Sequence, residues 1–217
     1  MHCEEFKMKK LLAVALVLVF TLCSCSSEKM EGNALEKYLE IIDSLECGTV
    51  FVTSDTSSNK ATIQFRQADM GCEILAVTKS GKSEYVNYFD GLFLYSGIGE
   101  LTKNEVGELD PVTVKRNLIG APDYSIEPEW YDEEKSGIYK TLTGYKIVVV
   151  THEEEQAFED NPDTTLTLYL DKNMVPTKAT IVDEIFGENM KVYTYKTTLK
   201  YDGIGIEPRF TAPSVAE

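Results

Sequence analysis

The sequence predicts an α+β fold: a strongly curved antiparallel β-sheet, a half-barrel of about nine strands or more, with an N-terminal helix and a mid-chain helical insertion packed on the concave side. Three observations predict it. Apolar and polar residues alternate through most of residues 49–201, with turn residues between the runs. A helical pattern precedes the first run, and an irregular segment at 97–136 interrupts the series. So long a sheet curls, and apolar helices are its natural filling.

The first 24 residues have the pattern of a signal peptide. Three lysines within residues 7–10 precede the apolar run LLAVALVLVF at 11–20. This run is too short for a membrane-spanning helix, which needs roughly 20 residues, but it fits the apolar core of a signal peptide. Met8 is a natural start for such a peptide, and residues 1–7 are then an upstream extension.

The end of this leader, Leu22-Cys23-Ser24-Cys25, resembles a bacterial lipobox, in which an aliphatic residue stands three places before the cysteine that becomes lipidated. Cys25 has Leu22 at that place, whereas Cys23 has Phe20. The resemblance implies diacylglycerol on the Cys25 thiol and Cys25 as the mature N-terminus. It also implies an exported domain that is anchored to the bacterial cell membrane and faces outward. Plain secretion and a metal-binding Cys-x-Cys pair are the alternatives.

The chain then divides into a signal peptide at 1–24, a lipidated tether at 25–32 and the half-barrel domain at 33–217. The tether is polar and short. At roughly 3.3–3.6 Å per residue it reaches about 25 Å, so we expect the domain to lie close to the membrane that holds Cys25.

One helix and five strands are expected in the first half of the domain. Apolar residues recur at three- and four-residue spacing in Asn33–Glu46, and Asn33 with Glu36 forms an N-terminal capping box. Asp90-Gly91 indicates a two-residue hairpin turn between the last two strands. The expected strands are Thr49–Ser54, Lys60–Gln67, Cys72–Thr78, Glu84–Phe89 and Leu92–Ser96.

The mid-chain insertion is expected to carry a short helix and a flap. Asp110-Pro111 opens this helix and Gly120 closes it. The acidic stretch IEPEWYDEEKSG at 126–137 holds the single tryptophan and is interpreted as a flap over an edge of the sheet. Strands then resume at about Ile138–Thr151, Thr164–Asp171, Thr177–Phe186 and Met190–Tyr201.

Two stretches resemble the LolA/LolB/LppX superfamily of lipoprotein-sorting and lipid-binding proteins. In LTLYLDKNMVPTKATI, Leu166 to Ile181, a strand ends in an acidic turn and a proline-containing segment enters the next strand. In the tail, Tyr193 to Pro213, a strand ends at Tyr201-Asp202-Gly203 before further prolines. The resemblance covers almost all of residues 30–213. It implies an incomplete barrel with helices on its concave side, and binding of a lipid or another hydrophobic ligand.

The sequence offers little for covalent chemistry. His152 is the only histidine after the leader, so the sequence lacks a multi-histidine metal centre and a zinc-protease motif. It also lacks a nucleophile elbow, a phosphate loop and a dinucleotide fingerprint. The acidic run at 153–163 lacks the EF-hand order, and its alternatives are a calcium site and a solvated hairpin loop. We therefore expect a non-enzymatic protein without catalytic residues, metal or cofactor.

The net charge of −15 limits the partners. It repels phosphate backbones, so no nucleic-acid partner is expected, and it argues against docking on anionic lipid through a basic patch. The expected partners are the membrane, through the lipid on Cys25, a lipid or other hydrophobic ligand, and an envelope protein.

The inward-facing residues of the curved sheet are the candidates for a ligand cavity, and ordinary core packing is the alternative for each of them. If the cavity is open, the chain binds or carries a lipid or other hydrophobic ligand. If it is filled, the chain is a protein-interaction or sensor module of the envelope. The candidate residues are Ile63, Phe65, Ile147 and Val149, with Trp130 near the rim.

Cys47 and Cys72 are the two cysteines of the domain. Export would place them in an oxidising compartment, where a Cys47–Cys72 disulfide can persist. Cys72 alternates with Ile74 and Ala76, so a buried free thiol is the alternative.

Overall fold

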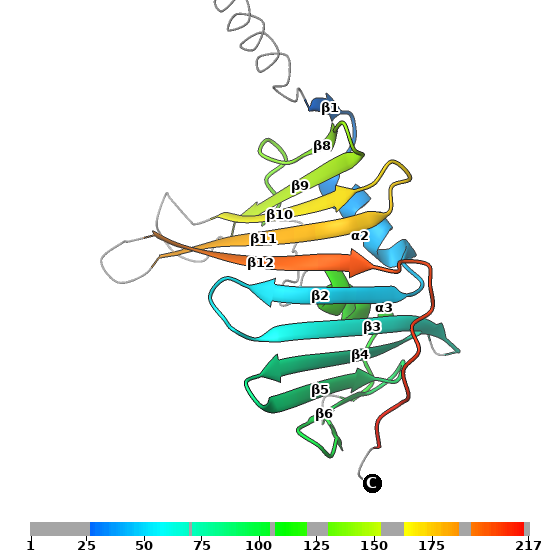
Figure 1. Cartoon of the computed structure of the whole chain (residues 1–217). Helices are drawn as coiled ribbons and strands as arrows, with labels where there is room; N and C mark the ends of the chain where they lie inside the picture. Colours follow the sequence, from blue (N-terminus) through cyan, green and yellow to red (C-terminus); the bar gives the residue numbers. More distant parts are fainter. Residues whose placement is uncertain are drawn as a thin grey trace, which may run out of the picture.

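The computed structural model describes residues 27–69, 71–104, 107–120, 130–152, 163–186 and 192–214. Within these residues, twelve strands form one open antiparallel sheet in the order β1-β8-β9-β10-β11-β12-β2-β3-β4-β5-β6-β7 (Figure 1). The strands are β1 (Glu28–Met30), β2 (Gly48–Ser54), β3 (Lys60–Ala68), β4 (Gly71–Ser80), β5 (Ser83–Phe89), β6 (Leu94–Gly97), β7 (Thr102–Lys103), β8 (Gly137–Lys140), β9 (Tyr145–His152), β10 (Asp163–Leu170), β11 (Pro176–Phe186) and β12 (Val192–Asp202).

The predicted N-terminal helix is α2 (Ala34–Ser44). Asn33 caps it as the sequence predicts, because its side-chain oxygen accepts a hydrogen bond from the Glu36 amide at 3.0 Å. The apolar stripe of α2 faces the sheet and contacts β9. Three- and four-residue spacing therefore gives one buried side of the helix, and the other side is polar.

The mid-chain insertion contributes α3 (Pro111–Lys115) and a π-helical turn, η1 (Arg116–Gly120). Asp110 caps α3 by accepting a hydrogen bond from the Thr113 amide at 2.9 Å. The insertion is tied to the end of α2: Arg116 Nε donates to Asp43 Oδ1 at 2.7 Å, and Lys115 Nζ donates to the carbonyl of Leu45 at 3.1 Å. These bonds satisfy carbonyl and carboxylate groups that a helix end leaves open.

Chain order and sheet order differ, and this difference places the helices. The chain starts at the β1 edge, passes through α2, and enters the middle of the sheet at β2. It then runs outward to β7, and the insertion carries it to β8, next to β1. Figure 1 shows α2 and α3 behind the sheet, so both helical segments cover one face.

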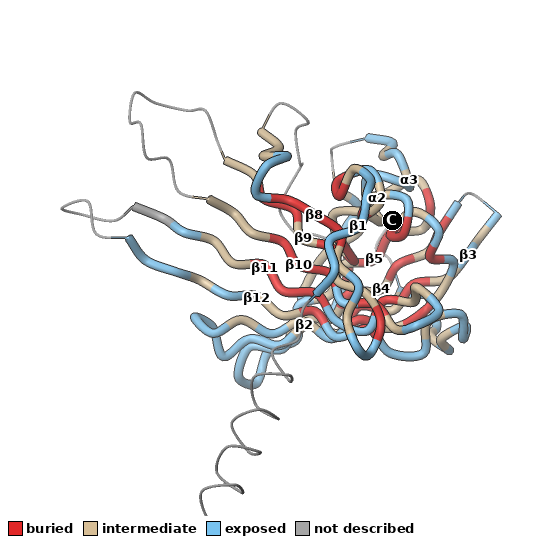
Figure 2. The backbone as a smooth tube through the Cα atoms, turned by 90° about the horizontal axis from the view of Figure 1, so that it is seen from above, coloured by how far each residue is buried: buried red, intermediate tan, exposed pale blue. Residues whose placement is uncertain are grey.

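The core lies between this covered face and the helices. Ile63 pairs with Val50 on one side and Ala76 on the other, and all three are buried. The same face continues through Leu199 and Ile181 into the other half of the sheet. Figure 2 shows the buried stretches of the strands gathered near α2 and α3. One hydrophobic cluster thus joins both halves of the sheet to the helices.

Three sequence-based expectations were wrong in detail. The single strand expected at 138–151 is the hairpin β8–β9, whose turn needs Gly144, since a Cβ there would lie 2.1 Å from the Leu170 carbonyl oxygen. The Asp90-Gly91 turn is a four-residue loop closed by Asp90, whose carboxylate accepts from the amides of Leu92 and Phe93. The short strands β1 and β7 were not expected, because so few residues carry too little alternation to predict a strand.

Candidate binding surface

Four of the five residues predicted to line a ligand cavity belong to the packed core. Ile63, Phe65, Ile147 and Val149 are 0–4% exposed and share one hydrophobic cluster with α2. Trp130 is half-buried and directly precedes Tyr131, which bridges to Thr151 at the end of β9. Tyr131 therefore extends the sheet beside the end of β9, while residues 126–129 of the predicted flap lie outside the described residues. Neither of two pockets found among the described residues is lined by any of the five.

Cys47 and Cys72 are both free thiols, so the disulfide considered from the sequence is not formed. Cys47 directly precedes β2 and Cys72 lies on β4, with β3 between these two strands. Two inter-strand steps separate the cysteines by about 9–10 Å, more than the roughly 7 Å that a disulfide can bridge between Cα atoms. Cys72 is the buried thiol of the alternative interpretation, and burial raises its pKa.

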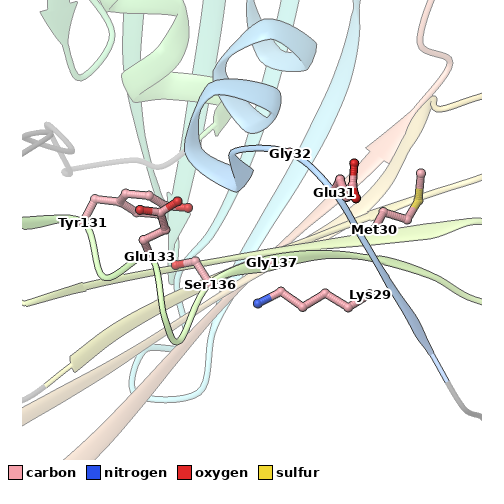
Figure 3. Close-up of a pocket in the computed structure, with 8 residues that line it drawn as sticks. All are labelled: Lys29, Met30, Glu31, Gly32, Tyr131, Glu133, Ser136 and Gly137. Carbon is pink, nitrogen blue, oxygen red and sulfur yellow. The ribbon is translucent and has the colours of Figure 1, made fainter.

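One pocket, of about 460 Å³, lies where β1 meets the segment before β8 (Figure 3). Lys29 and Glu31 approach it from the β1 side, and Tyr131, Glu133 and Ser136 approach it from the other. Ser136 is buried, and its hydroxyl oxygen accepts the Val150 amide at 2.9 Å. Ligand pockets are mostly apolar, whereas Lys29, Glu31 and Glu133 bring three charges to this one beside Met30 and Tyr131.

A second pocket, of about 280 Å³, lies on the concave face at the strand ends away from α2. Val52, Ala61 and Ile181 form its apolar part, and Asp183 and Thr197 form its polar part. Its volume is below the roughly 300–1,000 Å³ of ordinary ligand pockets. An acyl chain would find little enclosed apolar space in it.

The outer face of the sheet, opposite the core, carries a row of lysine and aromatic side chains. Pairing register places these residues side by side on seven adjacent strands, from β1 at the edge to β2 in the middle. At about 4.8 Å for each of the six inter-strand steps, the row is about 29 Å long. We call it the lysine–tyrosine row, and its members are Lys29, Tyr139, Lys146, Tyr169, Lys178, Lys200 and Phe51.

Neighbouring members of the row touch one another. The Lys146 ammonium lies 4.8 Å from the centre of the Tyr139 ring, and the Lys178 ammonium lies 5.5 Å from the Tyr169 ring. Gly137 leaves room for the first part of the row, because a Cβ there would lie 3.0 Å from both Lys29 Cε and the Tyr139 ring. These two contacts place the ammonium groups of Lys146 and Lys178 beside aromatic rings on the outer face.

The charges of the row are not neutralised within the described residues. Lys29, Lys146, Lys178 and Lys200 form no ion pair there. Lys178 and Lys200 even face each other on neighbouring strands, an arrangement of like charges that costs stability. On the outer face, Asp163 and Glu184 stand at the strand ends away from the row, whereas Asp202 is two residues from Lys200 at the same end as the row. The row crosses β9 to β12 near one end of these strands, and its four lysines make that strip of the outer face locally basic in an acidic protein.

Two tyrosine hydroxyls are buried in the core. The Tyr201 hydroxyl donates to the carbonyl of Ile119 in η1 at 2.7 Å, whereas the buried Tyr38 hydroxyl has no hydrogen-bond partner. Burial raises the pKa of both hydroxyls.

In the described part of the chain, no three His, Cys, Asp or Glu side chains gather as a metal site. No helix in that part has the length and apolar content needed to span a membrane.

The predicted tether is shorter than the sequence indicates. Glu28–Met30 pairs with β8 as the edge strand β1, so residues 28–30 are part of the sheet. Cys25 itself lies outside the described residues. If Cys25 is the attachment point, only Ser26 and Ser27 separate it from the sheet edge and from Lys29, the first member of the row.

Comparisons with known proteins show no family for this chain. No family model and no curated protein matches it. Among solved structures, it is similar to a chain in the complex of Pseudomonas aeruginosa MucA and MucB, with 14% sequence identity and a TM-score of 0.33. The match covers 77% of this chain and 54% of that chain. So distant a likeness carries no argument about function, which is inferred instead from the residues and geometry of the chain itself.

Proposed function

We propose that the chain is a lipid-anchored, non-enzymatic interaction module of the bacterial cell envelope. One observation carries this choice between the two functions expected from the sequence: the apolar face of the sheet is occupied by the chain's own helices. Phe65 and Ile147, which would contact a ligand in a carrier, are fully buried against that filling. The surface is then the part left for recognition, and an envelope protein is one partner that it can contact.

The sheet with its helices also supports, as a proposal, a half-barrel of the LolA/LolB/LppX kind. The helix-strands-insertion-strands order and the open sheet fit such a barrel. In this proposal the space that would hold a lipid is closed by α2 and η1. Lipid extraction of the purified protein followed by mass spectrometry tests this point. We expect no bound lipid in stoichiometric amount besides the covalent anchor, and a co-purified lipid would restore the carrier function.

The anchor is tested by metabolic labelling with palmitate. We expect the label on the full chain and its loss in Cys25→Ala. Cys23→Ala is the matched control, because it changes a cysteine two residues away and leaves Leu22 and Cys25 in place. Label that survives in Cys25→Ala would remove the anchoring part of the proposal, and localisation by plain secretion would replace it.

A further inference from the structure

The lysine–tyrosine row joins charges that lie far apart in the sequence. Lys29, Lys146 and Lys200 come from three different strands, and only the strand order brings them into one line. Ordinary solubility does not require such a line, because isolated surface lysines are usually balanced by nearby carboxylates. Facing like charges at Lys178 and Lys200 lower stability unless an anion lies over them. The geometry of the row therefore indicates an anionic surface as its counterpart.

An extended anionic surface fits the row better than a single acidic residue would. The row runs about 29 Å across adjacent strands, with ammonium groups and aromatic rings along its length. Tyrosines are amphipathic and prefer the membrane interface, while lysines extend their ammonium groups toward phosphate at the headgroup level. Alternation of these two side chains is suited to contact with a headgroup layer.

The net charge of −15 favours a membrane, to which the chain is tethered, over a freely diffusing acidic partner. The field of the whole chain repels any free polyanion during approach. At physiological ionic strength the screening length is about 8 Å, so the row acts only at contact. A tether removes the need for that approach, since it holds the two surfaces at high effective concentration. From Cys25 to Glu28 the chain reaches about 10 Å, which keeps the row at the membrane.

We propose that the outer face, along the lysine–tyrosine row, lies on the anionic headgroups of the membrane to which Cys25 is attached. The proposal rests on the proposed function, because the anchor at Cys25 brings this face to the bilayer. Lipidation holds the protein at the membrane, and the row sets its orientation. Contact of the row with the headgroups leaves the opposite side, with α2 and the insertion, turned toward the aqueous compartment and available to a partner.

The first experiment measures lysine accessibility on the full chain in its membrane. An amine-reactive acetylating reagent is applied to membrane-bound protein and to protein released in neutral detergent, and modified lysines are quantified by mass spectrometry. We expect Lys146, Lys178 and Lys200 to be protected in the membrane and reactive in detergent. Lys82 and Lys103, exposed near the other edge of the sheet, are the internal controls and should react equally in both. Equal reactivity of row and control lysines would overturn the proposal.

The second experiment does not use the lipid anchor. Full chain carrying Cys25→Ala is mixed with an excess of vesicles of phosphatidylcholine alone or with phosphatidylglycerol, so that weak binding without a tether is populated, and bound protein is measured by sedimentation. Binding to phosphatidylcholine alone reports what the apolar leader at 11–20 contributes. The row variant is Lys146→Gln/Lys178→Gln/Lys200→Gln. The control variant, Lys37→Gln/Lys82→Gln/Lys103→Gln, has the same net charge and the same leader.

At about fivefold per lysine near an anionic surface, the row variant should bind phosphatidylglycerol vesicles on the order of 100-fold more weakly. The control variant should change by less than about threefold, because its lysines lie away from the row. Equal losses in both variants would show that total charge, and not the row, governs binding, and would overturn the proposal.

The two experiments separate failure of the anchor from failure of the docking face. If palmitate labelling shows no lipid on Cys25 but the vesicle assay shows the difference between variants, the proposed anchor is wrong and the face still binds anionic lipid. If Cys25 is lipidated but row and control lysines behave alike, the docking face is wrong. Protection of the row lysines only when other envelope proteins are present would assign the face to an acidic protein partner and overturn the membrane proposal.

Discussion

The two faces of the sheet are built from the same strands but differ in their surroundings, because one is covered by helices and the other is the outer face. On β2 and β3, Val50, Ile63 and Phe65 point into the core, while Phe51 and Lys60 point outward. The covered face is uniform across both halves of the sheet and is filled by helices. The outer face differs along the strands, with lysines and aromatic rings near one end of β9 to β12. Stability is therefore set mainly by the covered face, and the proposed membrane contact uses the outer one.

The largest expected effect on stability comes from a substitution on the covered face. Phe65→Ala removes a fully buried ring and should lower the free energy of unfolding by about 3–5 kcal/mol. Phe51→Ala, on the next strand but 39% exposed on the outer face, should cost about 1 kcal/mol or less. Urea unfolding followed by circular dichroism gives both values. Equal costs would mean that the Phe51 side chain is packed as tightly as Phe65, and that the outer face is not free to contact a membrane or a partner.

A second pair of variants compares two buried hydroxyls in the core. Tyr201→Phe leaves the Ile119 carbonyl without its donor and should cost about 1–3 kcal/mol. Tyr38→Phe removes a buried hydroxyl that has no partner, so it should be neutral or stabilising. The same urea titration measures both. Destabilisation by Tyr38→Phe would show that this hydroxyl has a partner after all, such as a bound water.

The Asp90 carboxyl, in the loop between β5 and β6 near the sheet edge, makes the stability of the fold depend on pH. Burial of the Asp90 carboxyl opposes its ionisation, but hydrogen bonds from the amides of Phe93 and Leu92 and from the Tyr95 hydroxyl hold its pKa below the usual range. Because this pKa is lower in the folded state, the stabilisation is present above the unfolded pKa of roughly 3.9 and is lost as pH falls through the folded value.

Asp90→Asn should therefore cost about 1 kcal/mol near neutral pH, and the cost should shrink as pH falls below roughly 4. Urea unfolding at several pH values measures the difference from the unchanged protein. Asp202→Asn is the control, because no hydrogen bond holds that carboxylate within the described residues. A cost of Asp90→Asn that stays constant with pH would contradict a role of the ionised carboxylate.

The smallest expected effect on stability comes from a substitution on the outer face. Lys200→Glu turns the facing Lys178–Lys200 pair into opposite charges and should stabilise the fold by about 0.2–1 kcal/mol. The same change should weaken binding to phosphatidylglycerol vesicles. Thermal unfolding and vesicle sedimentation measure the two effects on one variant. Loss of both stability and binding would indicate that Lys200 has a structural role on this face.

Much of the fold could be predicted from local patterns. Alternation located eight of the ten longer strands separately and identified Ile63, Phe65, Ile147 and Val149 as inward-facing. The β8–β9 hairpin was merged into one strand, because Gly144 was not recognised as a close-packed turn. Alternation tells which side of a strand is buried. It does not tell whether the covering material is a ligand or the chain's own helix, and here α2 and η1 cover that side.

Net charge was the weakest guide to the surface. The value of −15 argued against docking on anionic lipid through a basic patch, but it gave no indication that lysines without an ion pair gather along one line of the outer face in the described residues. A sum over the chain contains no information about position. The useful signal was in the strand patterns themselves, where Tyr169 and Lys178 occupy outward positions of predicted strands. Without the register between strands, these positions could not be joined into a row.

By itself, the sequence determined local features such as the Asn33 cap of α2 and the inward and outward sides of each strand, and it predicts the leader with its lipobox-like end. These depend on residues within a few positions of one another. Only the tertiary structure decided that β2 pairs with β12, that Glu28–Met30 joins the sheet beside β8, and that the lysines align. Strand order and register depend on contacts between distant segments, which no local period contains.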